Sequence, residues 1–115
     1  MNPPFEEMST LDRLVHEPAR LAILTALAAC KGADFVYLRA LTGLTNGNLS
    51  GHLGKLERAQ LIAVDKTFKG KIPQTHVRLT AEGRAGVTKH WKRLAQLRKA
   101  ADAWGASLLP RTAER

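Results

Sequence analysis

The sequence predicts one mainly α-helical domain that carries a small β-hairpin. Its 115 residues suffice for a single domain, and a hydrophobic content of 44% is close to the globular average. Apolar residues recur at helical spacing along most of the chain, whereas Thr75 to Leu79 alternate with a period of two. The formal charge is +8. This excess favours a polyanionic partner, with nucleic acid first and an anionic membrane second.

The first half of the chain predicts four helices. Positions 1–8 are interpreted as an N-terminal arm, and Ser9 or Thr10 can cap a first helix. Pro18 suits the first turn of a second helix, which Lys31 and Gly32 would end with Gly32 in the left-handed conformation.

The helix-turn-helix follows from the next set of caps. Asp34 can cap a third helix, which ends at Thr42 and Gly43, and Thr45 can cap a fourth. This fourth helix ends near Gln60 and carries one narrow apolar stripe. The stripe consists of Leu49, Leu53 and Leu56.

The second half predicts the hairpin and one long helix. Residues 61–64 read as a short β-like run, residues 69–74 as a loop, and residues 75–79 as a strand. Thr80 can cap a last helix from about Ala81 to Ser107. This order predicts a winged helix-turn-helix over residues 9–80, a dimerisation helix over 81–109 and a tail over 110–115.

Three segments resemble one family. They run from His16 to Leu21, from Leu41 to Ile62 and from Val77 to Arg84. Together they are similar to winged-helix bacterial transcription regulators of the MarR and ArsR type. The resemblance implies a homodimer whose recognition helices enter successive major grooves. Gln60 stands where these families usually have glycine, and a left-handed glutamine there would carry strain.

The outward face of the fourth helix is the candidate surface for reading DNA. With the leucine stripe inward, Gly47, Gly51 and Arg58 point outward at about 100° per residue, and Gly54 lies on the flank, so three glycines follow this face. Each glycine costs roughly 1 kcal/mol in a helix interior, and the missing Cβ allows close approach to a groove; simple tolerance is the alternative. The resemblance places Asn48, Ser50 and His52 at the groove, with capping and half-buried packing as alternatives for Asn48 and His52. The candidate DNA-binding residues of this helix are Thr45, Asn46, Asn48, Ser50, Gly51, His52 and Lys55.

The hairpin supplies a second candidate DNA surface. Lysines surround Gly70 at its tip, where point charges can lie along the phosphate backbone or the minor groove. A solvated hairpin whose lysines prevent edge pairing is the alternative. Arg39 could reach a phosphate from the preceding helix or remain solvated. The candidate residues of the hairpin are Lys66, Lys69, Gly70, Lys71, Gln74, His76 and Arg78.

The last helix carries a heptad seam with a 3-4-3-4-3-4 spacing. Pairing with a two-fold partner would bury this seam, and folding back onto its own domain is the alternative. Trp91 lies off the seam and is expected against the first helix near Leu11 and Leu14. The candidate dimer-interface residues are Val87, His90, Leu94, Leu97, Ala101, Trp104 and Leu108.

The sequence therefore predicts a non-enzymatic, cytoplasmic homodimer that binds double-stranded DNA at a pseudo-palindromic operator, as a repressor. It contains no phosphate loop, nucleophile elbow or paired metal ligands, so no metal and no cofactor are expected. No apolar run approaches the roughly 18 residues of a membrane span, so no membrane partner is expected. The single Cys30 excludes an internal disulfide and fits a reducing cytosol; a redox sensor is the alternative.

The sequence leaves open two other functions and a possible small-molecule effector. A winged helix can serve as a protein–protein interaction module without DNA binding. An RNA-binding winged helix would need exposed aromatic side chains, and only Phe35, Tyr37 and Phe68 are candidates. A small-molecule effector could bind in a cleft lined by Tyr37, His90 and Trp91, for which core packing is the alternative.

Overall fold

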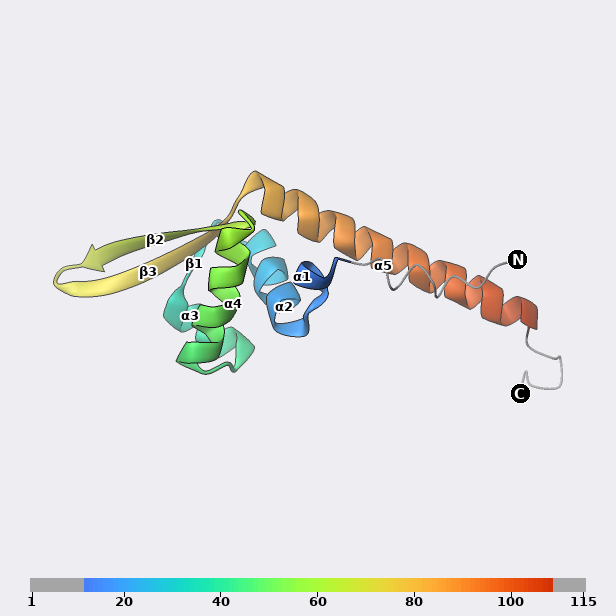
Figure 1. The fold of residues 1–115 in the computed structure, drawn as a ribbon, viewed down its shortest axis with the longest axis horizontal. Coiled ribbons are helices and arrows are strands. Elements are labelled where there is room, and N and C mark those ends of the chain that lie inside the picture. Colours follow the sequence, from blue (N-terminus) through green and yellow to red (C-terminus); the bar gives the residue numbers. More distant parts are fainter. Residues whose placement is uncertain (1–11, 109–115) are drawn as a thin grey trace.

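The structure is a computed structural model that describes residues 12–108, and its element order is that of a winged helix (Figure 1). The helices and strands of this part of the chain are α1 (Arg13–His16), α2 (Pro18–Ala28), β1 (Ala33–Asp34), α3 (Phe35–Thr42), α4 (Asn46–Arg58), β2 (Ile62–Lys69), β3 (Ile72–Leu79) and α5 (Ala81–Leu108). Figure 1 shows the β2–β3 hairpin and α5 extending in opposite directions from a body formed by α1 to α4. The predicted mainly α fold with a hairpin and a long last helix is confirmed.

One hydrophobic core joins the body to the base of the hairpin. The predicted stripe of α4 is buried, since Leu49 and Leu56 are fully covered and Leu53 is only 5% exposed. Each such leucine contributes roughly 1.5–3 kcal/mol through burial. The stripe packs with Leu38 of α3 and with the buried side chains of α2, β2, β3 and α5. The opposite face of α4 is thereby left toward solvent.

The first helix begins later than predicted. α1 starts at Arg13, and Asp12 is its cap, because the Asp12 carboxylate accepts a hydrogen bond from the Leu14 N–H at 2.9 Å. The predicted caps Ser9 and Thr10 lie outside the described residues. An acidic side chain fills the cap position here, as is common at helix N-termini.

The second helix starts as predicted but ends early. Pro18 occupies its first turn and the Glu17 carboxylate caps it. α2 ends at Ala28, so the predicted stop at Lys31 and Gly32 is wrong, and Gly32 does not adopt a left-handed conformation. Gly32 instead lies so close to the His76 side chain that a Cβ atom would overlap it. A close approach between chain segments explains this glycine, which a turn does not.

The hairpin belongs to a three-stranded antiparallel sheet in the order β1–β3–β2. The sequence gives no sign of β1, because two residues are too short to show a period; Ala33 pairs with Val77. The predicted loop over residues 69–74 is also wrong. Lys69 pairs with Ile72, and a tight turn with Gly70 at φ 66° joins the strands. The β2–β3 hairpin therefore has longer strands and a shorter connecting turn than the sequence predicts.

The first turn of α5 is held against the residues that follow α4. Gln60 has φ 63°, so it adopts the left-handed conformation in which a glutamine carries strain. Thr80 caps α5, because its Oγ1 accepts from the Gly83 N–H at 2.9 Å and donates to the Gln60 carbonyl at 2.7 Å. A Cβ atom on Gly83 would overlap the Leu61 carbonyl oxygen. α5 continues without interruption through Gly83 and Gly86 for 28 residues, a length of about 42 Å.

Candidate nucleic-acid interface

The turn between α3 and α4 sets the position of the exposed face of α4. Gly43 ends α3 with φ 69°, and the Thr45 Oγ1 caps α4 by accepting from the Asn48 N–H at 3.1 Å. Both features match the predictions for this turn. Because the leucine stripe is covered by the body, the polar residues of α4 are left facing outward.

The outward face of α4 is polar and open. Asn48, Ser50 and Lys55 are all exposed, and none of their side chains makes a hydrogen bond to another of the described residues. A Cβ atom placed on Gly47 or Gly51 would meet nothing within 4 Å. This part of α4 thus offers free donors and acceptors along a backbone that another surface can approach closely.

Gly54 differs from the other two glycines of this helix. Its absent Cβ leaves room for the Arg58 guanidinium, whose Nη1 lies 3.2 Å from the Cβ position. The guanidinium folds back along the helix at this point. Arg58 is exposed and its side chain can shift by a few tenths of an ångström, so this contact alone does not require a glycine at position 54.

Asn46 is tied to the preceding helix. Its Oδ1 accepts a hydrogen bond from Arg39 Nη1 at 2.7 Å. Arg39 had been expected either at a phosphate or in solvent, and it instead links α3 to the first residue of α4. The Asn46 side chain keeps both amide N–H donors and one lone pair on Oδ1 for another partner.

His52 turns away from the outward face. Its side chain is 22% exposed, and its Nδ1 lies 3.2 Å from Arg20 Nη1 and 3.6 Å from Glu17 Oε2. The structure thus favours the half-buried packing alternative for His52 over groove contact. Arg20 also donates through Nε to the Leu14 carbonyl at 2.7 Å, so this cluster fastens α4 to α1 and α2.

The carboxylate of this cluster has a lowered pKa. Burial raises the pKa of Glu17, but hydrogen bonds from the Arg20 and Ala19 N–H groups and the charges of His52 and Arg20 outweigh it. The net effect holds the pKa of Glu17 below its ordinary value. The position of Glu17 directly before Pro18, which occupies the first turn of α2, is the sequence signal for this cap.

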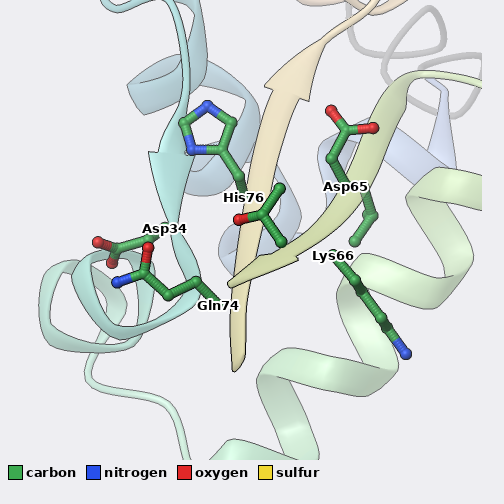
Figure 2. A pocket seen from close by; sticks show the side chains of 7 residues that line it. Asp34, Asp65, Lys66, Gln74 and His76 are labelled. Carbon is green, nitrogen blue, oxygen red and sulfur yellow. The ribbon is translucent and has the colours of Figure 1, made fainter. Parts of the chain in front are cut away.

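The outer half of the hairpin gathers the predicted basic residues. Lys66, Lys69, Gly70, Lys71 and Gln74 are all exposed. Side chains alternate along each strand, so Lys66 lies on the face that carries Ile62 and Val64 at the hairpin base, and Figure 2 shows it pointing away from Asp65. The structure therefore brings these residues together on a projecting ribbon.

Two predicted hairpin residues lie at its base instead. Arg78 Nε is 3.5 Å from Asp65 Oδ2, and both side chains are about half exposed. His76 projects beside β1, near Asp34 (Figure 2). An open groove on the three-stranded sheet is lined by residues of all three strands, namely Asp34, Val64, Asp65, Lys66, Thr67, Gln74 and His76.

This groove does not provide paired catalytic acids. The Asp34 carboxylate caps α3 by accepting from the Tyr37 N–H at 2.7 Å, and the Asp65 carboxylate faces Arg78. Each acid therefore already has a structural partner. Between residues 12 and 108, no cluster of three or more His, Cys, Asp or Glu side chains could hold a metal ion.

The first two residues of the predicted α5 seam are buried within the chain itself. Val87 is 2% exposed within the chain's own core, and His90 is 4% exposed with its Nε2 3.0 Å from His16 Nδ1 of α1. A side chain covered in this way cannot meet a second copy, so the intramolecular alternative is correct for both. Burial lowers the pKa of His90, and the neighbouring charge of His16 lowers it further.

The remainder of the seam lies further along α5. Leu97 is 7% exposed, whereas Leu94, Ala101 and Trp104 are half-buried. The side chain of Leu108 lies outside what the structure describes. Leu97 is therefore covered within the single chain, as Val87 and His90 are, and Leu94, Ala101 and Trp104 stay predictions for the dimer interface.

The residues expected around an effector cleft lie apart. Trp91 donates through Nε1 to Thr25 Oγ1 of α2 at 2.8 Å, which corrects the expected packing near Leu11 and Leu14; Leu11 lies outside the described residues. Trp91 lines a groove on α5, and Tyr37 lines another with the exposed Cys30. With His90 buried, these residues do not form one cleft.

Within residues 12–108, no helix combines the length and the apolar composition that crossing a bilayer requires.

The chain matches a family model described as winged helix DNA-binding domain over residues 19–98. An uncharacterised protein of Methanocaldococcus jannaschii is 31% identical over 88 residues, which cover 76% of this chain and 95% of that protein.

Two solved structures extend the comparison. A transcriptional regulator homologue from Pyrococcus horikoshii superposes with a TM-score of 0.78 at 26% identity, covering 86% of this chain and 97% of the other. A MarR-family regulator of Enterococcus faecalis superposes with a TM-score of 0.66 at 20% identity, covering 90% and 93%. The second likeness is one of fold alone, and it agrees with the predicted winged-helix fold.

Proposed function

The chain belongs to the winged helix DNA-binding domain family, and we propose that it regulates transcription as a homodimer that binds specific sequences of double-stranded DNA. The family and its structural neighbours are regulators rather than enzymes, as the sequence predicted. In this proposal α4 reads the major groove, the hairpin contacts the flanking backbone and minor groove, and α5 pairs the two copies.

The outward face of α4 is the observation that carries the proposal. Asn48 and Ser50 present unpaired hydrogen-bonding groups, of the kinds that recognise base edges. Gly47 and Gly51 give this face a bare backbone that no contact within the described residues requires. A helix that enters a groove uses both properties, since it must approach closely and then discriminate between bases.

The charge pattern supports the same surface. Between residues 46 and 74 the chain has five lysine or arginine residues and two carboxylates. One of those carboxylates, Asp65, is already paired with Arg78. The lysines on the outer half of the hairpin remain exposed and can neutralise phosphates.

The proposal is tested by selecting binding sites from a random duplex library and measuring affinity against salt. If about eight phosphates are neutralised, the slope of log K against log salt is near −7. Recovered sequences should form a pseudo-palindrome with half-sites about 34–36 Å apart. Selection that yields no consensus, together with a flat salt response, would exclude sequence-specific binding.

Variants separate reading from charge attraction. Replacing Asn48 and Ser50 by alanine should reduce the preference for the selected site over random duplex. Replacing Lys69 and Lys71 by alanine should weaken both duplexes alike and lower the salt slope by about two. Gln96→Ala, an exposed polar position on α5, is the matched control and should change neither quantity.

The homodimer is proposed through the far part of α5. Leu94, Ala101 and Trp104 keep the heptad spacing and are only half-buried in the single chain. Ala101→Glu should therefore convert a dimer to a monomer in sedimentation velocity. Ala103→Glu places the same charge on an exposed position two residues away and should leave the dimer intact.

Repression follows from this proposal if the operator overlaps a promoter. A promoter–reporter fusion carrying the selected site should lose expression when the wild-type protein is present, and should keep expression with the Asn48 and Ser50 variant. Increased expression would instead make the protein an activator.

A protein-interaction module is the second candidate function. α3 exposes apolar side chains, with Val36 62%, Tyr37 56% and Leu41 51% exposed, and such patches often mark protein contacts. This function predicts no salt-dependent duplex binding and a partner lost on Tyr37→Lys substitution. The same variant should leave duplex affinity unchanged if α4 and the hairpin bind DNA.

A further inference from the structure

The tip of the hairpin exposes two large apolar side chains. Phe68 is 72% exposed and Ile72 is 67% exposed, the highest fractions among the large hydrophobic residues described. The base of the same hairpin is buried, with Ile62 at 2% and Val77 fully covered. The hydrophobic core therefore explains the apolar residues at the base but not those at the tip.

The register places the two tip residues on opposite faces. Phe68 pairs with Pro73, and Ile72 pairs with Lys69 across the tight turn. Because side chains alternate along a strand, Phe68 shares its face with Lys66 and with Ile62 at the base. Ile62 packs in the core with the leucine stripe of α4. Phe68 thus lies on the α4 side of the ribbon, and Ile72 lies on the other side.

The charges around this tip indicate the chemistry of its partner. Every charged side chain from residue 66 to residue 74 is a lysine, namely Lys66, Lys69 and Lys71. An apolar side chain among lysines fits a surface that is anionic outside and apolar within. The minor groove of duplex DNA has this character, since phosphates border it and stacked bases form its floor.

We propose that Phe68 is a wedge that enters the minor groove, partly unstacks one base step and bends the duplex. This inference rests on the proposed contact of the hairpin with DNA, and adds to it a deformation that depends on one apolar side chain. The α4 face of the hairpin is the side on which a duplex held by α4 lies. Lysines on the same ribbon hold the flanking phosphates while the ring unstacks the step.

The wedge predicts sequence preference at a step that no side chain reads by hydrogen bonding. Pyrimidine–purine steps unstack most easily, so they should be enriched where the hairpin meets the duplex. Such enrichment would appear in the selected site outside the bases that α4 contacts.

The test uses full-length protein and the duplex selected from the random library. Dyes at the two duplex ends report bending by energy transfer, and 2-aminopurine placed at successive steps reports unstacking. Wild-type protein should raise the energy transfer and brighten 2-aminopurine at one step on each flank. Phe68→Ala should abolish both signals and weaken binding about tenfold, the loss typical of one aromatic–base stacking contact.

Ile72→Ala is the matched control, because it removes an equally exposed apolar side chain from the opposite face. It should bend and unstack the duplex like wild type, and Phe68→Trp should restore both signals. Thermal melts of the variants show whether the hairpin still folds.

Each other outcome overturns the wedge in a recognisable way. Tight duplex binding without bending or unstacking removes the wedge and leaves the proposed function intact. Equal effects of Phe68→Ala and Ile72→Ala make the tip a general hairpin contact, and unchanged DNA signals in both assign it to a protein partner. Absence of any duplex binding by wild type removes the wedge and the proposed function together.

Discussion

The glycines of α5 and α4 are alike in the sequence and opposite in the structure. Gly83 lies in the first turn of α5, where a Cβ atom would overlap the Leu61 carbonyl oxygen. Gly51 lies in the middle of α4, where a Cβ atom would meet nothing within 4 Å. The chain's own packing requires the first glycine and places no demand on the second.

This contrast separates two causes of an unfavourable residue. A glycine within a helix costs roughly 0.5–1 kcal/mol relative to alanine. At Gly83 that cost is offset by the close fit between α5 and the residues after α4, which Thr80 also holds through the Gln60 carbonyl. At Gly51 no contact within the described residues offsets that cost. The proposed groove contact would offset it, and simple tolerance of the glycine is the alternative.

The largest expected effect concerns the inward glycine. Gly83→Ala forces a methyl group against the Leu61 backbone, which cannot move aside as a side chain could. We expect the free energy of unfolding to fall by about 3 kcal/mol, at the upper end of the range for overpacking. Urea denaturation measures this change.

Gly86→Ala is the control for that prediction. A Cβ atom at Gly86 would meet only the Leu61 Cδ2 at 4.0 Å, an ordinary contact. We expect this variant to be neutral or slightly more stable than wild type. Equal losses for both variants would show that the contact with the Leu61 carbonyl is not what makes Gly83 necessary.

The next effect concerns the strained residue beside the same junction. Gln60 has φ 63°, which costs a residue with a Cβ atom roughly 1–2 kcal/mol. Gln60→Gly should raise the free energy of unfolding by about 1 kcal/mol, after allowance for the greater freedom of glycine in the unfolded chain. Gln60→Ala keeps the Cβ atom, so denaturant titration should show no such gain.

Local rules predicted the parts of this fold that depend on single residues. Gly43, Thr45 and Thr80 all behave as their turn and capping preferences indicate, whereas Gln60 adopts a left-handed conformation that its type disfavours. The rules failed for Gly32, where a turn was predicted, because the actual cause is the approach of His76 from a strand more than 40 residues away. Contacts between distant segments leave no local signal.

The candidate site shows the same limit. The helical period of α4 correctly separated the buried Leu49 and Leu53 from the exposed Ser50. It could not show that His52 contacts Arg20 of α2. Nor could the heptad spacing show that Val87 belongs to the core, since a seam for a partner and a seam for the chain's own helices share one period.

A smaller effect tests how α5 is held against α1. The pKa of His90 lies below its ordinary value because of burial and the charge of His16. The folded chain therefore resists protonation, so its stability is complete above about pH 6.5 and declines as the pH falls through the lowered pKa of His90. Urea midpoints measured from pH 7 to pH 5.5 should decrease, and His90→Gln should flatten this decrease.

His76→Gln serves as the control, because it removes an exposed imidazole from the hairpin. This variant should retain the wild-type dependence of the midpoint on pH. The interval above pH 5.5 also excludes the contribution of Glu17, whose lowered pKa affects stability only below its ordinary value near 4.5. An unchanged slope in His90→Gln would mean that His90 does not couple folding to pH.

The smallest change in stability is expected at the outward glycine, and it has the opposite sign. Gly51→Ala adds a methyl group in open space and restricts the unfolded chain, so the free energy of unfolding should rise by about 0.5 kcal/mol. The same methyl group would hold α4 away from the groove floor, and affinity for the selected duplex should fall. Gly86→Ala should not change that affinity. A Gly51→Ala variant that is more stable and binds DNA as tightly as wild type would show that the bare face of α4 is only tolerated, and that close approach to a groove does not explain it.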